Sequence, residues 1–254
     1  MATQTLLRGF AKGQTRDNTP NPDTLWSGNF YARKGATMSL YYQDEHVTLY
    51  HGDCLTEHRE WLDADVLVTD PPYGYSHKSG RDGKFKGEVI ANDSDLKARD
   101  SALEAWGDKA AIVFGSWKRP KPNGTHTVLI WDKGEAAGMG NLAIPWKPNW
   151  EEIYVLGRGY SGHRGSSILS GHTVVTWASK GREHPNMKPE TLMEALVAKC
   201  PSGVIADPFA GSGSTLIAAR NLGRKAIGVE MEEKYCEIIA KRLDQQVIDF
   251  DSLV

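Results

Sequence analysis

The stretch VIADPFAGSGST, residues 204–215, decides the fold of this chain. Its apolar start is typical of a buried strand, and a turn containing Gly211 and Gly213 follows. The next residues, 215–222, predict a helix that Gly223 ends. Glycines let the backbone approach a ligand closely, and a helix N-terminus offers unpaired N–H groups. The stretch therefore predicts a ligand-binding turn between a strand and a helix of an α/β fold.

The segment after this helix indicates which kind of ligand the turn binds. A second strand, over residues 226–229, ends at Glu230, which follows Asp207 by 23 positions (230 − 207). In dinucleotide folds an acidic residue about 20 positions further on reaches a ribose hydroxyl. The turn lacks the full Gly-x-Gly-x-x-Gly spacing and has no Gly-Lys-Ser/Thr. We therefore expect a nucleoside-type cofactor rather than a dinucleotide or a triphosphate.

A second motif, Asp70-Pro71-Pro72-Tyr73, follows a short apolar strand over residues 66–69. The Asp70 carboxylate should therefore lie at the carboxyl end of a buried strand, where ligands bind in open α/β sheets. The two prolines fix the backbone and donate no N–H, so their carbonyls remain as acceptors. With the flat ring of Tyr73, these groups suit a planar ligand that carries an exocyclic NH2. The alternative interpretation is a structural Pro-Pro turn.

The two motifs together resemble those of the DNA amino-methyltransferases, which transfer a methyl group from S-adenosylmethionine to adenine N6 or cytosine N4. Asp-Pro-Pro-Tyr resembles the catalytic motif of that family, and Phe-x-Gly-x-Gly after Asp-Pro resembles its S-adenosylmethionine loop. The catalytic motif comes first, because Asp207 follows Asp70 by 137 positions (207 − 70). This order resembles the permuted β class of the family. The match covers roughly residues 38–247.

The resemblance and the alternation of strands with helices imply one fold class. It is a Rossmann-like α/β methyltransferase fold with a permuted motif order, a mostly parallel twisted sheet and helices on both faces. The family implies one antiparallel strand within that sheet. Further predicted elements are strands over 110–114, 127–131, 152–156 and 173–177, and a helix over 98–107. Residues 1–37, rich in Thr, Asn, Pro and Gly, predict a disordered or loosely docked extension to a single methyltransferase domain over 38–254.

The resemblance also implies the site residues. In catalysis, the Asp70 side chain and the Pro71 carbonyl accept the two amine hydrogens, Pro72 completes the rigid turn, and Tyr73 stacks on the base. The residues implied to bind the cofactor are Asp53, Cys54, Asp70, Lys188, Asp207, Pro208, Phe209, Ala210, Gly211, Ser212, Gly213, Ser214, Glu230 and Met231. No metal site is implied.

Two of these assignments have structural alternatives. Lys188 lies in His184-Pro185-x-x-Lys188-Pro189, ahead of a predicted helix over 191–199, and resembles the segment that covers the methionine end of the cofactor. Lys188 would then pair with the cofactor carboxylate, although a proline-punctuated helix start fits equally. Asp53 follows a predicted strand and corresponds to a family residue near the cofactor's adenine amine, but a helix N-cap is as compatible.

Two basic, glycine-containing segments predict contacts with double-stranded DNA. The first follows the catalytic motif, and its basic residues include Lys78, Arg81, Lys84 and Lys86. Such a loop could close over a phosphate backbone, or it could be a solvated surface loop. The second, with Arg158 and Arg164, occupies the chain position of the family's recognition insert. We expect these short target-recognition loops, around 76–92 and 157–171, to form opposite walls of a DNA cleft. Their brevity favours a small footprint or a homodimer.

The composition fits an enzyme with one core. The chain has 254 residues, 40% of them apolar, and a formal net charge of −2 that decides nothing about nucleic acid. No apolar run approaches the ~18 residues of a membrane span, and the N-terminal residues show no signal-peptide core. Three scattered cysteines argue against a zinc site or a disulfide framework and suit a reducing cytoplasm.

The function implied is adenine-N6 methylation of a base flipped out of the duplex. Family members with Ser in place of Asp70 favour cytosine, and glutamine-specific relatives carry Asn there, so the Asp favours adenine. Cytosine N4 stays open as the near alternative, and a protein or RNA N-methyltransferase is more distant. A non-catalytic S-adenosylmethionine-binding DNA module is the alternative of a different class, which the intact Asp70 and Tyr73 argue against. The recognised site, the oligomeric state and any restriction endonuclease partner stay open.

Overall fold

The computed structural model describes residues 30–31, 40–75, 94–135, 142–172 and 187–245. Several predictions from the sequence lie outside these residues. They are the strand over 173–177, most of the extension over 1–37, and the basic residues Lys78, Arg81, Lys84 and Lys86. Within the described part of the chain, no helix is long and apolar enough to cross a membrane.

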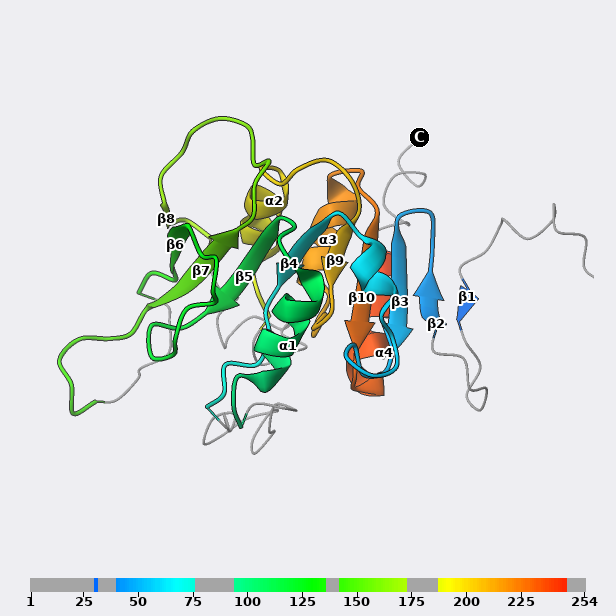
Figure 1. Ribbon diagram of the computed structural model, residues 1–254, viewed down its shortest axis with the longest axis horizontal. Coiled ribbons are helices and arrows are strands. Elements are labelled where there is room, and N and C mark those ends of the chain that lie inside the picture. The colour runs from blue at the N-terminus through cyan, green and yellow to red at the C-terminus, as the bar shows by residue number, and fades with distance from the viewer. Residues whose placement is uncertain (1–29, 32–39, 76–93, 136–141, 173–186, 246–254) are drawn as a thin grey trace, which may run out of the picture.

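One sheet of ten strands forms the centre of the described structure, in the order β1-β2-β3-β10-β9-β4-β5-β7-β6-β8 (Figure 1). The strands are β1 (Phe30–Tyr31), β2 (Leu40–Gln43), β3 (Val47–His51), β4 (Val66–Thr69), β5 (Ala111–Gly115), β6 (Thr127–Asp132), β7 (Trp150–Leu156), β8 (Ile168–Leu169), β9 (Ile205–Asp207) and β10 (Ala226–Glu230). The five central strands, from β3 to β5 in the sheet order, run parallel. β7 runs antiparallel between β5 and β6, as the family implied, and β2 also runs antiparallel to β3.

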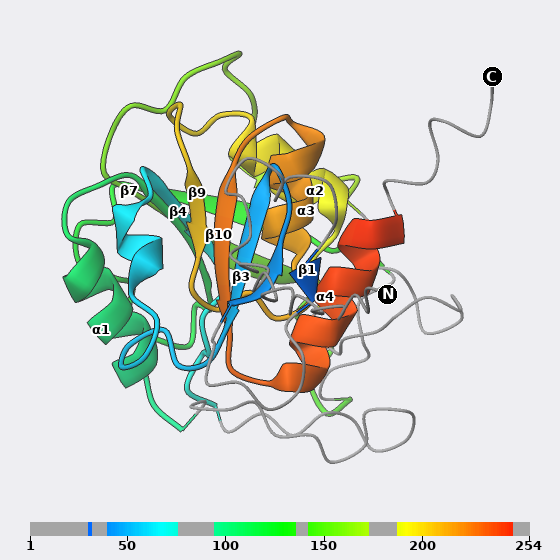
Figure 2. The same cartoon turned by 90° about the vertical axis from the view of Figure 1, so that its right-hand side faces the viewer.

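Helices cover both faces of this sheet (Figure 2). They are α1 (Lys97–Trp106), α2 (Glu190–Val197), α3 (Ser214–Asn221), α4 (Glu233–Gln245) and the short 3-10 helix η2 (Glu60–Asp63). α1 and η2 lie on one face, and α2, α3 and α4 lie on the other. The predicted fold class, a mostly parallel sheet covered on both sides, is therefore confirmed.

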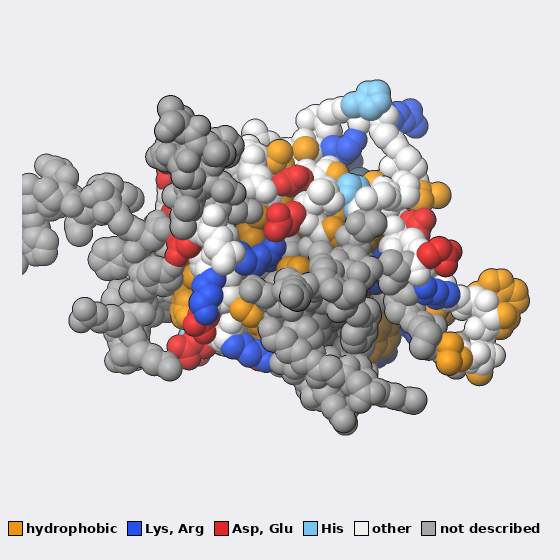
Figure 3. All heavy atoms as spheres, turned by 180° about the vertical axis from the view of Figure 1, so that it is seen from behind, with side chains coloured by type: hydrophobic (Ala, Val, Ile, Leu, Met, Phe, Trp, Pro, Cys, Tyr) orange, Lys and Arg blue, Asp and Glu red, His pale blue; other side chains and the backbone are white. Residues whose placement is uncertain are grey.

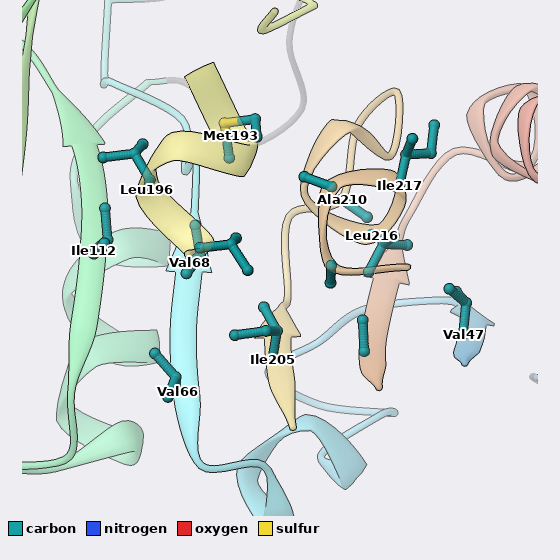
Figure 4. Packing of buried hydrophobic residues seen from close by; sticks show 14 of the residues in the cluster. Val47, Val66, Val68, Ile112, Met193, Leu196, Ile205, Ala210, Leu216 and Ile217 are labelled. Carbon is teal, nitrogen blue, oxygen red and sulfur yellow. The ribbon is translucent and has the colours of Figure 1, made fainter. Parts of the chain in front are cut away.

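The alternation of side chains along β4 divides the core into two layers. All four residues of this strand are buried, which explains why the first three are apolar and why the hydroxyl of the fourth, Thr69, is hydrogen-bonded to Asp207. Val66 and Val68 face α2 and α3, where they join a cluster that includes Leu196 (Figure 4). Leu67 faces the other way and packs in a cluster with Trp61 and Trp106, whose rings stack 5.8 Å apart. A strand buried on both faces holds its carboxyl end rigidly.

Most strands and helices predicted from the sequence are present within one or two residues. The predicted strands over 66–69, 110–114, 127–131 and 152–156 correspond to β4, β5, β6 and β7, and the helix over 215–222 corresponds to α3. β2, β8 and α4 were not predicted. β1 belongs to the predicted extension, and it pairs antiparallel with β2.

The sheet order brings the two sequence motifs together. β9, which leads into the glycine-containing turn, lies directly between β10 and β4. Because these strands are parallel, their carboxyl ends meet at one edge of the sheet. Asp70, Asp207 and Glu230 therefore lie along the same edge, although the first two are far apart in the chain.

Candidate active site

Asp70, one residue beyond β4, is already held by two donors. The Tyr73 hydroxyl donates to its Oδ1 at 2.6 Å, and the Lys188 ammonium donates to its Oδ2. The Lys188 side chain is only 7% exposed, and that of Asp70 is 25% exposed. Lys188, which the sequence assigned to the cofactor carboxylate, thus pairs with the candidate catalytic carboxylate in this structure. Its contact with the cofactor stays a prediction.

A second carboxylate, Glu151, lies beside this ion pair, and the sequence analysis missed it. Its Oε2 is 3.4 Å from the Lys188 Nζ and 3.4 Å from the Tyr73 hydroxyl oxygen. Its Oε1 accepts a hydrogen bond from the Lys133 ammonium. The only signal in the sequence is a pair of charged residues, Glu151 and Glu152, at the start of an otherwise apolar strand.

Burial and charge give the members of this cluster different protonation preferences. Burial, the largest influence, raises the pKa of Asp70, and the attraction of Lys188 offsets only part of that effect. Burial also opposes ionisation of Glu151, but Lys188 and Lys133 together outweigh it and hold its pKa below the ordinary value. Burial disfavours the Lys188 ammonium, whereas the two carboxylates raise its pKa overall. Burial thus favours the neutral form of Asp70, whereas the two ammoniums favour the ionised form of Glu151.

Two hydrogen bonds connect Thr69 and Lys188, the neighbours of Asp70, to the two ends of the turn after β9. The Thr69 hydroxyl donates to the Asp207 Oδ1 at 2.7 Å, and the Ser214 hydroxyl donates to the main-chain carbonyl of Lys188 at 2.9 Å. Asp207 is only 2% exposed, and its Oδ1 also accepts the Phe209 N–H at 3.2 Å. Burial raises the pKa of Asp207 to about 6. In this structure the buried Asp207 side chain therefore holds the start of the turn against β4.

The turn itself needs glycine at its centre. Gly211 and Gly213 adopt φ values of +54° and +80°, the left-handed region that favours glycine. A Cβ atom at Gly213 would also come within 2.9 Å of the Ile239 side chain in α4. Ile239 is fully buried, so it cannot easily give way.

Glu230, at the end of β10, closes the other side of the turn. Its Oε2 accepts the Gly211 N–H at 2.7 Å, and its Oε1 accepts the Glu232 N–H at 2.8 Å. A carboxylate has about four acceptor positions, so two are left by the described residues for a ligand such as a ribose diol. Burial raises the pKa of Glu230 to about 7.

Three other residues assigned to the cofactor lie near the ends of β3 and β10. The Asp53 Oδ1 accepts the Leu55 N–H at 2.8 Å, so this side chain caps a turn. This role is similar to the helix N-cap that the sequence left open as an alternative. Cys54 is buried, and its carbonyl accepts the Trp61 indole N–H. Met231 is 39% exposed and follows Glu230 directly. Whether these residues contact the cofactor stays a prediction.

The segment over 157–167 does not join this site. β7 runs antiparallel to β5 and ends opposite Ala111, the first residue of β5, so the chain leaves the sheet at the edge away from Asp70. The segment then contacts the end of α2, where the Ser161 N–H donates to the Lys199 carbonyl at 3.0 Å. The segment carrying Arg158 and Arg164 therefore starts at the edge away from Asp70, and its contact with DNA stays a prediction.

A different loop, between β6 and β7, leaves the sheet at the catalytic edge. The two ends of this loop lie side by side in the sheet, because Asp132, the last residue of β6, lies opposite Trp150, the first residue of β7. Its exposed apolar residues include Leu142, Ile144 and Trp146. Figure 3 shows hydrophobic side chains at the lower right, whereas the basic and histidine side chains of the segment over 157–167 lie at the upper right.

Comparison with known proteins identifies the family. A family model described as DNA methylase matches residues 118–241. The type II methyltransferase M.ScaI of Streptomyces caespitosus is 43% identical over 273 residues, which cover 84% of this chain and 86% of that protein. The chain is a DNA methyltransferase of the N6/N4 family. The type II methyltransferase M2.LlaDCHI of Lactococcus lactis subsp. cremoris is 26% identical over 271 residues, covering 85% and 97% of the two chains.

Solved structures confirm the fold of this N6/N4 methyltransferase. The M1.HpyAVI–SAM complex matches with a TM-score of 0.57 and 21% identity, over 78% of this chain and 99% of that chain. The PvuII DNA methyltransferase, cytosine-N4-specific, matches with a TM-score of 0.59 and 15% identity, over 82% and 89% of the two chains. The cofactor of the N6/N4 methyltransferase is S-adenosylmethionine, as the sequence predicted.

If Glu230 binds the cofactor, as the resemblance implies, its pKa predicts how cofactor affinity depends on pH. The Glu230 pKa lies near 7, above its ordinary 4.5, so the side chain takes up a proton as the pH falls below about 7 and loses acceptor strength. Affinity for S-adenosylmethionine should then fall by up to about tenfold per pH unit on the acid side. Glu230→Gln should weaken binding at alkaline pH by about tenfold or more, because bonds to a charged group contribute ~1.5–3 kcal/mol.

Calorimetric titrations of the two proteins between about pH 5.5 and 8.5 test this dependence. The wild-type dissociation constant should rise on the acid side, and that of Glu230→Gln should stay flatter. Parallel curves for the two proteins would assign the pH dependence to another group.

Proposed function

We propose that this DNA methyltransferase belongs to the permuted β class and methylates adenine N6 in double-stranded DNA. The observation that carries the proposal is the position of Asp70. Its carboxylate lies at the carboxyl end of β4, and the neighbouring Thr69 is hydrogen-bonded to the strand that leads into the cofactor turn. An amine acceptor beside the cofactor turn is what methyl transfer to an exocyclic NH2 requires.

The target base has to leave the duplex before Asp70 can reach its amine. Stacking of the flipped base on Tyr73 would offset about 1–3 kcal/mol of the unstacking cost. The Asp70 carboxylate and the Pro71 carbonyl then accept one amine hydrogen each. This arrangement turns the nitrogen lone pair out of conjugation with the ring and towards the methyl group. Catalysis by these residues is mainly orientation and electrostatic stabilisation.

The residues of the turn fit S-adenosylmethionine. Glu230 retains two acceptor positions for the ribose hydroxyls, and the Gly211–Gly213 backbone allows close approach. The bound cofactor supplies an activated methyl group, which forms a bond to the amine nitrogen while the methyl–sulfur electron pair stays on sulfur. The amine loses one proton in this exchange, which the Asp70 carboxylate accepts and then releases to solvent. The ionised form of Asp70 is the one that accepts the amine hydrogen.

The choice of adenine over cytosine rests on the carboxylate at position 70. It is tested by incubating the purified protein with unmethylated duplex DNA and S-adenosylmethionine labelled in the methyl group, followed by nucleoside analysis. We expect label in N6-methyldeoxyadenosine. Label in N4-methyldeoxycytidine would support the near alternative, and unlabelled DNA with intact cofactor binding would support a binding module.

The position of Asp70 in the sheet also predicts which arginines can be replaced without a change in DNA methylation. Arg158 and Arg164 lie in the segment that leaves the opposite edge of the sheet. We therefore expect the double change Arg158→Ala and Arg164→Ala to leave the methylated sites unchanged and to alter DNA affinity by less than about tenfold, the value of one good base contact. Sequencing with modification detection reads the sites. A changed site preference would restore the recognition role that the sequence suggested.

A further inference from the structure

Both oxygens of Asp70 are occupied before any substrate binds. The Tyr73 hydroxyl donates to Oδ1 at 2.6 Å, and the Lys188 ammonium donates to Oδ2. If Asp70 accepts a target amine, as the proposed function requires, it becomes a stronger acceptor when one of these donors turns away, because each donor already draws on the charge of the carboxylate. A buried ammonium that leaves its partner needs another anion nearby, because an unpaired buried charge is costly.

Glu151 offers that second anion to both donors. Its Oε2 lies 3.4 Å from the Lys188 Nζ and 3.4 Å from the Tyr73 hydroxyl oxygen, just beyond the usual hydrogen-bond length. A small movement of either donor would complete the bond. The Lys133 ammonium holds the other oxygen of Glu151, so the carboxylate is fixed while the donors move.

We propose that Glu151 is a positioning residue that receives Lys188 and Tyr73 when Asp70 turns to the target amine. The charges of the two carboxylates and the two ammoniums sum to zero both before and after the donors move from Asp70 to Glu151. Lys188 is also within 4 Å of both carboxylates from the start, so it stays paired throughout the exchange. Glu151 thereby keeps Asp70 available as an acceptor without itself touching the reacting atoms.

The chain offers a matched control in the next residue. Glu152 is on the same strand and is more deeply buried, at 8% exposure against 17% for the Glu151 side chain, but its Oε2 accepts the Tyr154 hydroxyl at 2.6 Å. Tyr154 packs in the core cluster on the α1 face of the sheet, whereas Glu151 contacts the Asp70 cluster. Glu152→Gln therefore removes a buried carboxylate from the same strand and leaves the Asp70 cluster intact.

The test compares single-turnover methylation by wild type, Glu151→Gln and Glu152→Gln, each saturated with S-adenosylmethionine and DNA. We expect Glu151→Gln to lower the methyl-transfer rate by at least about tenfold while its cofactor dissociation constant changes by less than about threefold. Glu152→Gln should stay within about twofold of the wild-type rate. An undiminished rate in Glu151→Gln overturns the proposal.

A second variant separates positioning from stability. Glu151→Gln alone leaves an excess ammonium, and an unpaired buried charge lowers the melting temperature. Adding Lys133→Met restores a neutral cluster of Asp70 and Lys188. If Glu151 positions the donors, the double variant regains the melting temperature but keeps the slow rate. Recovery of both quantities would show a purely structural role and overturn the proposal.

This inference rests on the proposed function, and the wild-type reaction distinguishes the two. A wild-type protein that methylates neither adenine nor cytosine overturns both proposals. An active wild type with an equally active Glu151→Gln overturns only the role of Glu151.

Discussion

Asp70→Ala is expected to lower methyl transfer by at least about 10²–10³-fold, the loss typical of removing one preorganised electrostatic contact in an active site. Cofactor binding should stay nearly unchanged, because the residues of the turn and Glu230 do not depend on the Asp70 side chain for their hydrogen bonds. Lys188 should also keep a partner in the variant, since Glu151 lies 3.4 Å from its Nζ. The fold is therefore expected to survive.

Turnover on unmethylated DNA and calorimetric binding of S-adenosylmethionine measure the two effects of Asp70→Ala separately. Asp70→Asn serves as a control that keeps the size of the side chain and one acceptor oxygen while removing the charge. It should show an intermediate rate. Undiminished turnover in Asp70→Ala would contradict the assignment of the catalytic acceptor.

Lys188→Met should have the largest effect on stability. It removes the ammonium that Asp70 and Glu151 share, and breaking a buried ion pair costs about 3–5 kcal/mol. The lower end of this range applies, because the Asp70 side chain is 25% exposed and partly solvated. Denaturant unfolding of both proteins at the same pH measures the difference. A loss below about 1 kcal/mol, the value of an exposed pair, would show that the cluster is solvated.

The same change should shift the pH dependence of the reaction. Burial already raises the pKa of Asp70, and Lys188 is the strongest influence that lowers it. Without Lys188 the pKa of Asp70 should rise further, so a larger fraction of Asp70 is protonated at a given pH. The acid limb of the pH–rate profile should therefore move to higher pH in Lys188→Met. An unmoved limb would indicate that a different group controls the rate on the acid side.

The parts of the site that could be predicted from the sequence depend on local signals. Two stretches each specify their own conformation over a few residues. One is the strand β4 with Asp70 and two prolines after it, and the other is the strand, glycines and helix after residue 204. Gly213 illustrates this, because both its left-handed φ and the nearby Ile239 side chain require glycine. The resemblance to a family then placed the two motifs together.

The parts that could not be predicted depend on strand direction. The family implied an antiparallel strand without saying which one it was. Because β7 is that strand, Glu151 at its start lies at the catalytic edge, and the segment over 157–167 after its end begins at the opposite edge. No local pattern around Glu151 reports this reversal. The pairing of Lys188 with Asp70 was missed for a related reason, since the two residues come from distant elements.

The most direct test of the account is the identity of the methylated base in cells. DNA from a methylation-free host that expresses the wild-type protein should be sequenced with modification detection, beside DNA from cells that express Asp70→Ala. The account predicts N6-methyladenine at one short sequence in the wild-type sample and its absence in the variant. N4-methylcytosine in the wild-type sample, or the same adenine methylation in both samples, would contradict it.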